Sequence, residues 1–553
     1  MKRSIKIYIT VALIGAAVLF AGFTNDKYYK IYHSFDVFSE VYKTITNYYV
    51  LDIDPDILAQ SAVDGMLETL DPYSVYYDEQ DYEDLDLINN NRYVGFGVSV
   101  NQIDSSNTII RVNEGFAADK AGMKIGDKLY KIDGVEVLNL PSDDLRKYTN
   151  GQPNSSADVT VIRNIVDTLS LSVKRETISL KDVVYYDVLE NDIAYIYLEG
   201  FSKKAPTEVR NAIKDMQRTH NLNGLILDLR GNPGGLLYSA IAICELFVPR
   251  GSMIVYTKGR DGEKIRTYKS TSDPLLPDLP LAVVINQGSA SASEIVAGAI
   301  QDLDRGIVVG RTSYGKGLVQ SVFGLSQNTN LKLTTAKYYT PSGRCIQRLG
   351  FGEKHREKII DTLQPQIFYT ENGREVTESI GIVPDSVIIE KELPMYIKDL
   401  HSNYLIFKFA NNYAATHKEL IPADTVPRRL LSLFEEYLLN NEYKLSSGLL
   451  EKIEDINKVA AEYAAGDKVL SKIEELKNIV IKEKLSIESE EYSDMLVEDI
   501  TAEILTRYLK QQDYYAYTIK NNKTIVRTLE LLKNQSEYHS ILAHGSEKNG
   551  VKN

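Results

Sequence analysis

The spacing of hydrophobic positions changes several times along the chain, and each change predicts a new structural unit. Between residues 28 and 91, apolar side chains recur at three- and four-residue steps, which is typical of amphipathic helices. Short runs of alternating polarity follow, such as YVGFGVSV from Tyr93 to Val100, and turn signals such as Asp-Gly close them. We therefore expect an N-terminal helical segment over 26–91 and a small domain of short strands over 92–175.

From residue 176 onward, strand and helix patterns alternate. Apolar runs such as GLILDL and LAVVIN precede glycine-containing loops, and amphipathic stretches follow those loops. This alternation predicts a layered α/β core over 176–390. Beyond it, glycine becomes rare and Glu, Lys, Leu, Ile and Tyr take helical spacing. We expect a separate all-α domain over 391–545 and a flexible polar tail over 546–553.

The N-terminus carries a targeting pattern. Lys2, Arg3 and Lys6 precede an uncharged, mostly apolar run over 7–23. A basic flank before such a run is typical of an export signal or a single membrane anchor, and less typical of a buried core helix. We assign 1–25 to a signal peptide or anchor, with cleavage and retention both open. The rest of the chain is then expected to be extracytoplasmic, in the periplasm or cell envelope.

Composition excludes some classes of function. The chain has 553 residues and a net charge of −13, with 63 Lys and Arg against 76 Asp and Glu, so a general nucleic-acid binder is not expected. Its two cysteines, Cys244 and Cys345, cannot by themselves form a disulfide framework or a four-cysteine zinc site. The seven histidines form no H-x-x-x-H pair. We expect no metal site and no cofactor.

The segment INQGSASASEIVAG, over 285–298, places serines at a strand-to-helix turn. A serine there can lie beside the first free N–H groups of the helix, which can stabilise an oxyanion. The alternative is structural, because Ser291 and Glu294 have the spacing of a capping box. On these residues alone, capping is favoured over catalysis.

The segment GRTSYGKGLVQ, over 310–320, is a near match to a phosphate-binding P-loop. Gly317, however, stands where that loop needs Ser or Thr, and a strand pattern follows where it needs a helix. Lys316 between two glycines could instead be partly buried, and a neutral amine could take a serine proton. Gln320 could orient that amine. An exposed turn lysine remains the alternative.

The loop LRGNPGG, over 229–235, follows a buried strand. The N–H groups of Gly234 and Gly235 are unhindered and could provide an oxyanion donor. A tight strand-to-helix connection explains the two glycines equally well.

Together these three motifs, in this order and spacing, resemble the C-terminal processing (tail-specific) serine peptidases. GMLETLDPYSVYY resembles the N-terminal segment of that family, although Tyr73 stands where histidine is frequent. YVGFGVSV and AADKAGMKIGDKLYKIDG resemble its PDZ domain, and KYYTPSGRCIQ and GIVPD the end of its core. The resemblance covers residues 30–390 and leaves the helical domain outside.

The resemblance implies an α/β fold: a crotonase-like layered peptidase core, an inserted PDZ domain, an N-terminal helical segment and a C-terminal all-α extension. It implies that Ser291 is the nucleophile, Lys316 the general base and Gln320 the orienting residue. With it, catalysis outweighs capping for Ser291.

The oxyanion hole implied by the resemblance combines the amide of Ala292 with the amide of Gly234 or Gly235. Neither a metal nor a cofactor takes part in this chemistry.

The PDZ-like segment implies a way of binding substrate. A PDZ domain adds a peptide as a strand to a sheet edge and holds its terminal carboxylate in a loop. Gly95, Phe96 and Gly97 are expected to form that loop, with Phe96 facing an apolar terminal side chain.

The sequence thus predicts a Ser-Lys endopeptidase that cleaves proteins near C-termini docked on the PDZ domain. The alternative is a non-catalytic PDZ scaffold. Protein or peptide C-termini are the expected partners, nucleic acid is not, and residues 7–23 are a candidate membrane anchor. For 391–545, a structural extension, partner binding and homo-oligomer formation all stay open.

Overall fold

In a computed structural model, the chain forms two compact units. The smaller comprises residues 1–79, 320–334 and 350–358, and the larger comprises the rest. The structure describes residues 28–77, 90–164, 167–260, 262–326, 329–350, 358–359, 366–378, 380–389, 393–421, 427–441, 443, 447–482 and 490–543.

The predicted signal or anchor over 1–25 and the predicted tail over 546–553 lie outside the described residues. Within the described ranges, none of the helices combines the length and apolarity that crossing a membrane requires.

The smaller unit contains the N-terminal helices. Residues 28–48 are helical, and α2 (Pro55–Leu67) follows, with Asp54 as its N-cap. A turn at Asp71 leads into β1 (Val75–Tyr77), which pairs antiparallel with the first part of β18 (Asn330–Tyr339). β17 (Leu318–Gly324) also pairs with β18.

The small domain expected over 92–175, which resembles a PDZ domain, is a β-sheet with two short helices. Its strand order is β3-β4-β5-β7-β8, with β6 paired to β5, and β2 and β9 form a separate pair. Leu129 and Val159 are completely buried in its core. The elements are β2 (Arg92–Gly95), β3 (Val98–Ile103), β4 (Ser106–Val112), α4 (Ala117–Lys120), β5 (Lys128–Ile132), β6 (Val135–Glu136), α5 (Ser142–Thr149), β7 (Ser156–Arg163), β8 (Asp167–Lys174) and β9 (Glu176–Ser179).

A six-stranded sheet forms the middle of the α/β core expected over 176–390. Its order is β10-β11-β12-β15-β16-β23, with β10 antiparallel and the other strands parallel. Its central strands β12 and β15 are buried at every position because both faces of the sheet are covered. The strands are β10 (Val183–Leu189), β11 (Ile193–Leu198), β12 (Gly224–Asp228), β15 (Leu281–Ile285), β16 (Ile307–Gly310) and β23 (Ser386–Val387).

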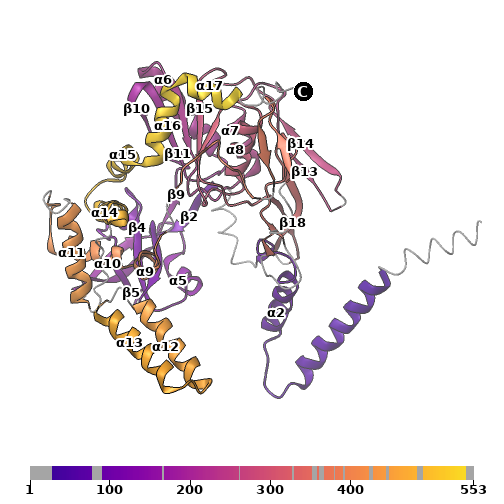
Figure 1. The fold of residues 1–553 in the computed structure, drawn as a ribbon. Coiled ribbons are helices and arrows are strands. Elements are labelled where there is room, and N and C mark those ends of the chain that lie inside the picture. The colour runs from indigo at the N-terminus through magenta and orange to yellow at the C-terminus, as the bar shows by residue number, and fades with distance from the viewer. Residues whose placement is uncertain are drawn as a thin grey trace, which may run out of the picture. The chain divides into compact units, whose positions relative to one another are not determined.

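Helices cover the two faces of this sheet as separate layers (Figure 1). Leu281 and Val283 point to the layer of α6 (Ala205–Thr219), α7 (Leu237–Cys244) and α8 (Ala292–Asp302). Ala282 and Val284 point to the other layer, α15 (Gln511–Asn521), α16 (Lys523–Lys533) and α17 (Gln535–Ala543). The last three helices of the described chain therefore belong to the α/β core.

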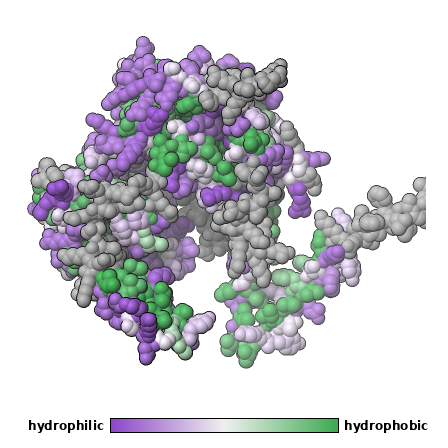
Figure 2. Space-filling view, viewed as in Figure 1, coloured by the Kyte–Doolittle hydropathy of each residue, from purple (hydrophilic) through white to green (hydrophobic). Residues whose placement is uncertain are grey.

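Four of the other C-terminal helices share a core of their own around Phe409, Phe434 and Ile500. The segment expected as one helical domain therefore divides, and this second core packs separately from the sheet. The four helices are α9 (Met395–Ser402), α10 (Leu405–Thr416), α11 (Pro427–Asn440) and α14 (Glu490–Leu505), and α12 (Ser447–Glu462) packs against α13 (Asp467–Lys482). In the space-filling view, apolar side chains gather on the α12–α13 hairpin (Figure 2).

Shorter strands complete the chain. β13 pairs with β14 and with the last residues of β18, and β21 pairs with β22. They are β13 (Met253–Lys258), β14 (Lys264–Lys269), β19 (Leu349–Gly350), β20 (Lys358–Ile359), β21 (Ile367–Tyr369) and β22 (Glu375–Thr377).

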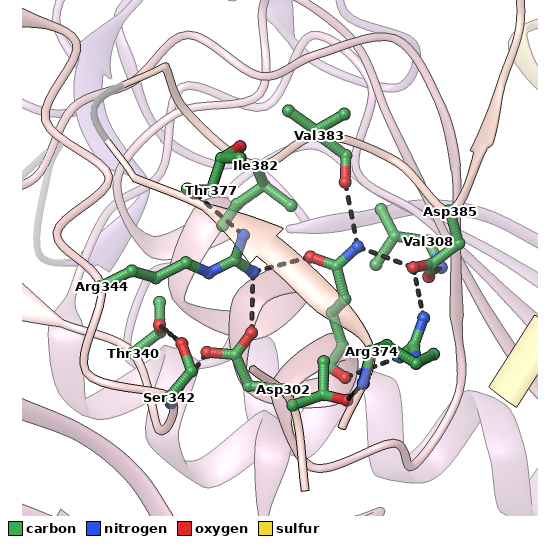
Figure 3. A network of polar contacts seen from close by, with 12 residues as sticks. Asp302, Val308, Thr340, Ser342, Arg344, Arg374, Thr377, Ile382, Val383 and Asp385 are labelled. Carbon is green, nitrogen blue, oxygen red and sulfur yellow. Dashed lines mark hydrogen bonds and ion pairs between the residues drawn. The ribbon is translucent and has the colours of Figure 1, made fainter. Parts of the chain in front are cut away.

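A buried polar network joins the end of α8 to the segment before β23 (Figure 3). Arg344 is completely buried and donates to both Asp302 and Gln301 at 2.7 Å. The Gln301 amide in turn donates to the Val383 carbonyl at 2.9 Å, and Arg374 binds Asp385 at 2.5 Å. This network holds residues 383–385 against α8, and the N–H of Ile382 donates to the Ser313 hydroxyl beside the candidate site.

Candidate active site

Ser291 occupies a strained turn between β15 and α8. Its backbone has φ 53° and ψ −109°, a region that residues other than glycine rarely adopt. Such a turn from a strand into a helix projects the side chain away from the chain path, as in the nucleophile elbow of the α/β-hydrolases. The residue is half-buried, and the buried Ala292 begins the helix beside it.

The two serines that flank Ser291 in the SASAS motif are structural. The Ser289 hydroxyl donates to the Leu229 carbonyl at 2.7 Å, and the Ser293 hydroxyl donates to the Asn232 carbonyl at 2.9 Å. Both serines are completely buried. Among the three, Ser291 alone is half-buried, so its hydroxyl is the one within reach of a substrate.

Glu294 joins the serine turn to the lysine loop. Its Oε2 accepts hydrogen bonds from the N–H of Ser291 at 2.8 Å and from the N–H of Lys316 at 2.9 Å. Its Oε1 accepts from the Ser313 hydroxyl at 2.5 Å and from the Gly315 N–H at 2.7 Å. The bond to Ser291 is the glutamate half of the predicted capping box, which is present in the structure, and it is one of the four bonds that Glu294 accepts.

The Glu294 carboxyl is completely buried. Burial raises its pKa, and the hydrogen bonds from Ser313 and from the backbone N–H groups of Lys316, Gly315 and Ser291 oppose that rise.

Tyr338 is a second link between the same two segments. Its hydroxyl donates to the Ser291 carbonyl at 3.1 Å and also to the Lys316 carbonyl. Glu294 and Tyr338 together hold the backbones of Ser291 and Lys316 side by side. The structure thus brings together two predicted site residues that lie 25 positions apart in the chain.

The NPGG loop approaches the serine turn closely. Gly234 has φ +104°, and a Cβ atom placed on it would lie 2.9 Å from both the Ser291 Cβ and the Ala292 nitrogen. Only glycine fits this position. The carbonyl of Asn232 accepts the Ala290 N–H at 3.0 Å, which fixes the loop against the turn.

The two loop glycines differ in their amides. The Gly234 N–H donates to the Asn232 side-chain oxygen at 2.9 Å. Gly235 also needs to be glycine, because a Cβ there would lie 2.6 Å from the Phe201 carbonyl oxygen. The structure therefore brings Gly234, Ser291 and Ala292 into contact, with Gly235 next in the chain.

Gln320 belongs to the smaller unit. It lies near the start of β17, and its side-chain amide donates to the Thr334 hydroxyl at 3.3 Å. Its orienting role toward Lys316 stays a prediction.

The predicted carboxylate loop of the PDZ domain leads directly into β3, which is an edge strand of the domain's sheet. Gly97 has φ +87°, and a Cβ there would lie 2.8 Å from the Phe116 Cβ. The Phe96 side chain is only 1% exposed and packs in the core of the domain. A charged residue at Phe96 would therefore unfold the domain instead of reporting on peptide binding.

Sequence reasoning missed Tyr338 and Ser313, and it assigned Glu294 only a capping role. The spacing of Ser291 and Glu294 carried a signal for a local contact. No pattern in the sequence indicated that the same carboxylate would bind a loop that begins nearly twenty residues later.

Among the described residues, no group of three or more His, Cys, Asp and Glu is placed to hold a metal ion. Cys244 is completely buried, and burial raises the pKa of its thiol, which makes it unreactive.

Comparison with protein families gives four matches along the chain. Residues 192–353 match peptidase family S41, and residues 94–175 match the PDZ domain. Residues 21–81 match the N-terminal domain of the activating protease CtpB, and residues 396–532 match the C-terminal helical domain of probable PDZ-proteases.

Similar proteins are named as carboxy-terminal processing proteases. The carboxy-terminal-processing protease of Bartonella bacilliformis is 35% identical over 356 residues, which is 63% of this chain and 81% of that protein. The carboxy-terminal processing protease CtpA of Bacillus subtilis is 30% identical, covering 65% of this chain and 79% of that protein.

The fold and these matches define a serine-type peptidase with a PDZ domain. The chain belongs to peptidase family S41 and, within it, to the carboxy-terminal processing proteases. The predicted α/β core with a PDZ domain and a C-terminal helical extension is confirmed.

Proposed function

We propose that this peptidase uses a Ser291–Lys316 dyad to cleave proteins near C-termini that dock on its PDZ domain. The observation that carries the proposal is the shared Glu294 oxygen, which accepts from the N–H of Ser291 and from the N–H of Lys316. A peptidase dyad needs its nucleophile and base held in fixed relation, and one buried carboxylate supplies that constraint.

The reaction begins with the Ser291 hydroxyl. The neutral Lys316 amine takes its proton as the oxygen attacks the scissile carbonyl carbon, and a C–O bond forms. The tetrahedral intermediate collapses as Lys316 returns the proton to the leaving amine, and the C–N bond breaks. Water then attacks the acyl-enzyme with Lys316 again as base, which releases the new carboxylate and regenerates Ser291.

The oxyanion is stabilised by backbone amides. The Ala292 N–H lies in the first turn of α8, where free N–H groups and the helix dipole favour negative charge. The second donor comes from the NPGG loop. The Gly235 amide is the better candidate, because the Gly234 amide already donates to Asn232.

Docking uses the edge strand β3 and the loop of Gly95, Phe96 and Gly97. A substrate tail adds to β3 as a further strand, and the loop amides hold its terminal carboxylate. The positive φ of Gly97 favours this, since it turns the loop sharply before the strand begins. Recognition through the backbone fits a substrate class of unstructured C-termini.

Export is part of the proposal. The basic residues before the apolar run over 7–23 favour an extracytoplasmic location, with that run as a signal or an anchor.

Cleavage of an unstructured protein with an apolar C-terminal tail tests the dyad. The wild type should cut it, whereas S291A, K316A and K316R should not. K316R is the matched control for charge, because arginine keeps the positive charge and cannot serve as a base. Equal cleavage by wild type and S291A would refute the proposal, and no cleavage by the wild type would favour a non-catalytic PDZ scaffold.

A further inference from the structure

A buried polar cluster lies directly before the NPGG loop. Asp228, at the end of β12, is completely buried and accepts a hydrogen bond from the Tyr195 hydroxyl at 2.6 Å. Arg230 binds the same carboxylate through Nε at 3.0 Å and through Nη2 at 2.6 Å. A bidentate pair of this kind fixes the plane of the guanidinium.

The third arm of Arg230 reaches the C-terminal helices. Its Nη1 donates to the Asn522 side-chain oxygen at 2.7 Å, across 292 positions of the chain. Asn522 lies between α15 and α16 and is the N-cap of α16, where the same oxygen accepts from Thr524 and Ile525. One oxygen thus anchors both a helix start and the guanidinium.

Arg230 is the residue next to the loop. Gly231 and Asn232 follow it, and the Asn232 carbonyl accepts from the Ala290 N–H and the Ser293 hydroxyl in the serine turn. Arg230 therefore lies two positions before the carbonyl that binds the serine turn. A shift of this loop would be costly, because an oxyanion donor works only at hydrogen-bond distance from the developing charge.

We propose that Asn522 is a positioning residue for the oxyanion loop and acts through Arg230. This rests on the oxyanion role proposed above for the NPGG loop. The helices α15 and α16 then help to position the oxyanion loop and also pack in the core.

Full-length variants separate positioning from helix capping. N522A removes both contacts and should lower kcat about tenfold with KM nearly unchanged. N522D keeps an acceptor for Arg230 and for the α16 amides, and it should restore kcat to within about twofold of the wild type. N534A is the matched control, because Asn534 accepts from the Glu537 N–H at the start of α17 and has no bond to Arg230.

The expected result is a kcat for N534A like that of the wild type, with a melting temperature lowered as in N522A. In an R230K background, N522A should have little further effect on kcat, because the residue through which it acts has changed. Equal kcat for N522A and N534A, or fully additive effects of N522A and R230K, would overturn the inference.

S291A in the same assay tests the proposed function itself. Loss of cleavage in S291A together with full activity of N522A would overturn the role of Asn522 and leave the dyad in place. Cleavage by S291A would overturn the dyad.

Discussion

Replacing Glu294 by glutamine keeps the size of the side chain and removes one of its two acceptor oxygens. Each oxygen accepts two hydrogen bonds, from Ser313 and Gly315 on one side and from Ser291 and Lys316 on the other. The NH2 group of glutamine must face one of these donor pairs. Two buried donors then lose their acceptor, whichever way the amide turns.

The structure sets the size of the effect. Glu294 is completely buried, so water cannot replace the lost acceptor. A buried donor without a partner costs about 1–3 kcal/mol, so E294Q should lower the free energy of unfolding by about 2–6 kcal/mol. If the serine turn and the lysine loop separate by about 1 Å, kcat should fall about a hundredfold.

Glu208 provides a matched control. It also lies in the first turn of a helix, α6, and accepts two backbone N–H bonds, from Asp182 and Val183. Both bonds end on the same oxygen, so E208Q can keep them with its carbonyl group. We expect E208Q to retain nearly all of its stability and activity.

The assay measures kcat and KM on a tail-bearing substrate, together with urea unfolding of the same proteins. E294Q should lower both kcat and the free energy of unfolding, and E208Q should change neither. Wild-type stability and kcat in E294Q would refute the reasoning that this carboxylate holds the two segments together.

Three further predictions follow from single contacts. S291A should abolish cleavage with almost no loss of stability. S293A should lose about 1–3 kcal/mol of unfolding free energy in urea and still cleave substrate, because the Ser293 hydroxyl only binds the loop. An inactive S293A that folds with wild-type stability would contradict this. R344M should lower the unfolding free energy by about 3–5 kcal/mol, because it leaves Asp302 buried without its partner, and an unchanged urea midpoint would count against it. G234A should lose cleavage while the PDZ domain stays folded, since its methyl group would collide with Ser291; full activity would contradict the close approach of the loop.

Local sequence patterns predicted most of the helices and strands, because these elements depend on apolar spacing and turn residues within one short segment. The apolar runs GLILD and LAVVI became the buried strands β12 and β15, and the SASASE segment became the start of α8. The glycines of the NPGG loop were expected to be close to an oxyanion, and the structure shows Gly234 in contact with Ser291.

Contacts between distant segments were not predictable from one sequence. The spacing of Ile525 and Leu532 indicates a helix, but the surface that this helix covers, the second face of the sheet, depends on the tertiary fold. The bond from Arg230 to Asn522 likewise joins two segments that carry no shared pattern. The sequence therefore predicted the helices over 391–545 and could not divide them between two cores.

The central claim is that Ser291 forms a covalent acyl-enzyme during cleavage of a C-terminal tail. Rapid quenching during turnover, followed by digestion and mass spectrometry, tests it most directly. We predict that the peptide containing Ser291 gains the mass of the N-terminal product fragment in the wild type, and that S291A gains none. Turnover at the wild-type rate by S291A, or an adduct on another residue in its place, would contradict the account.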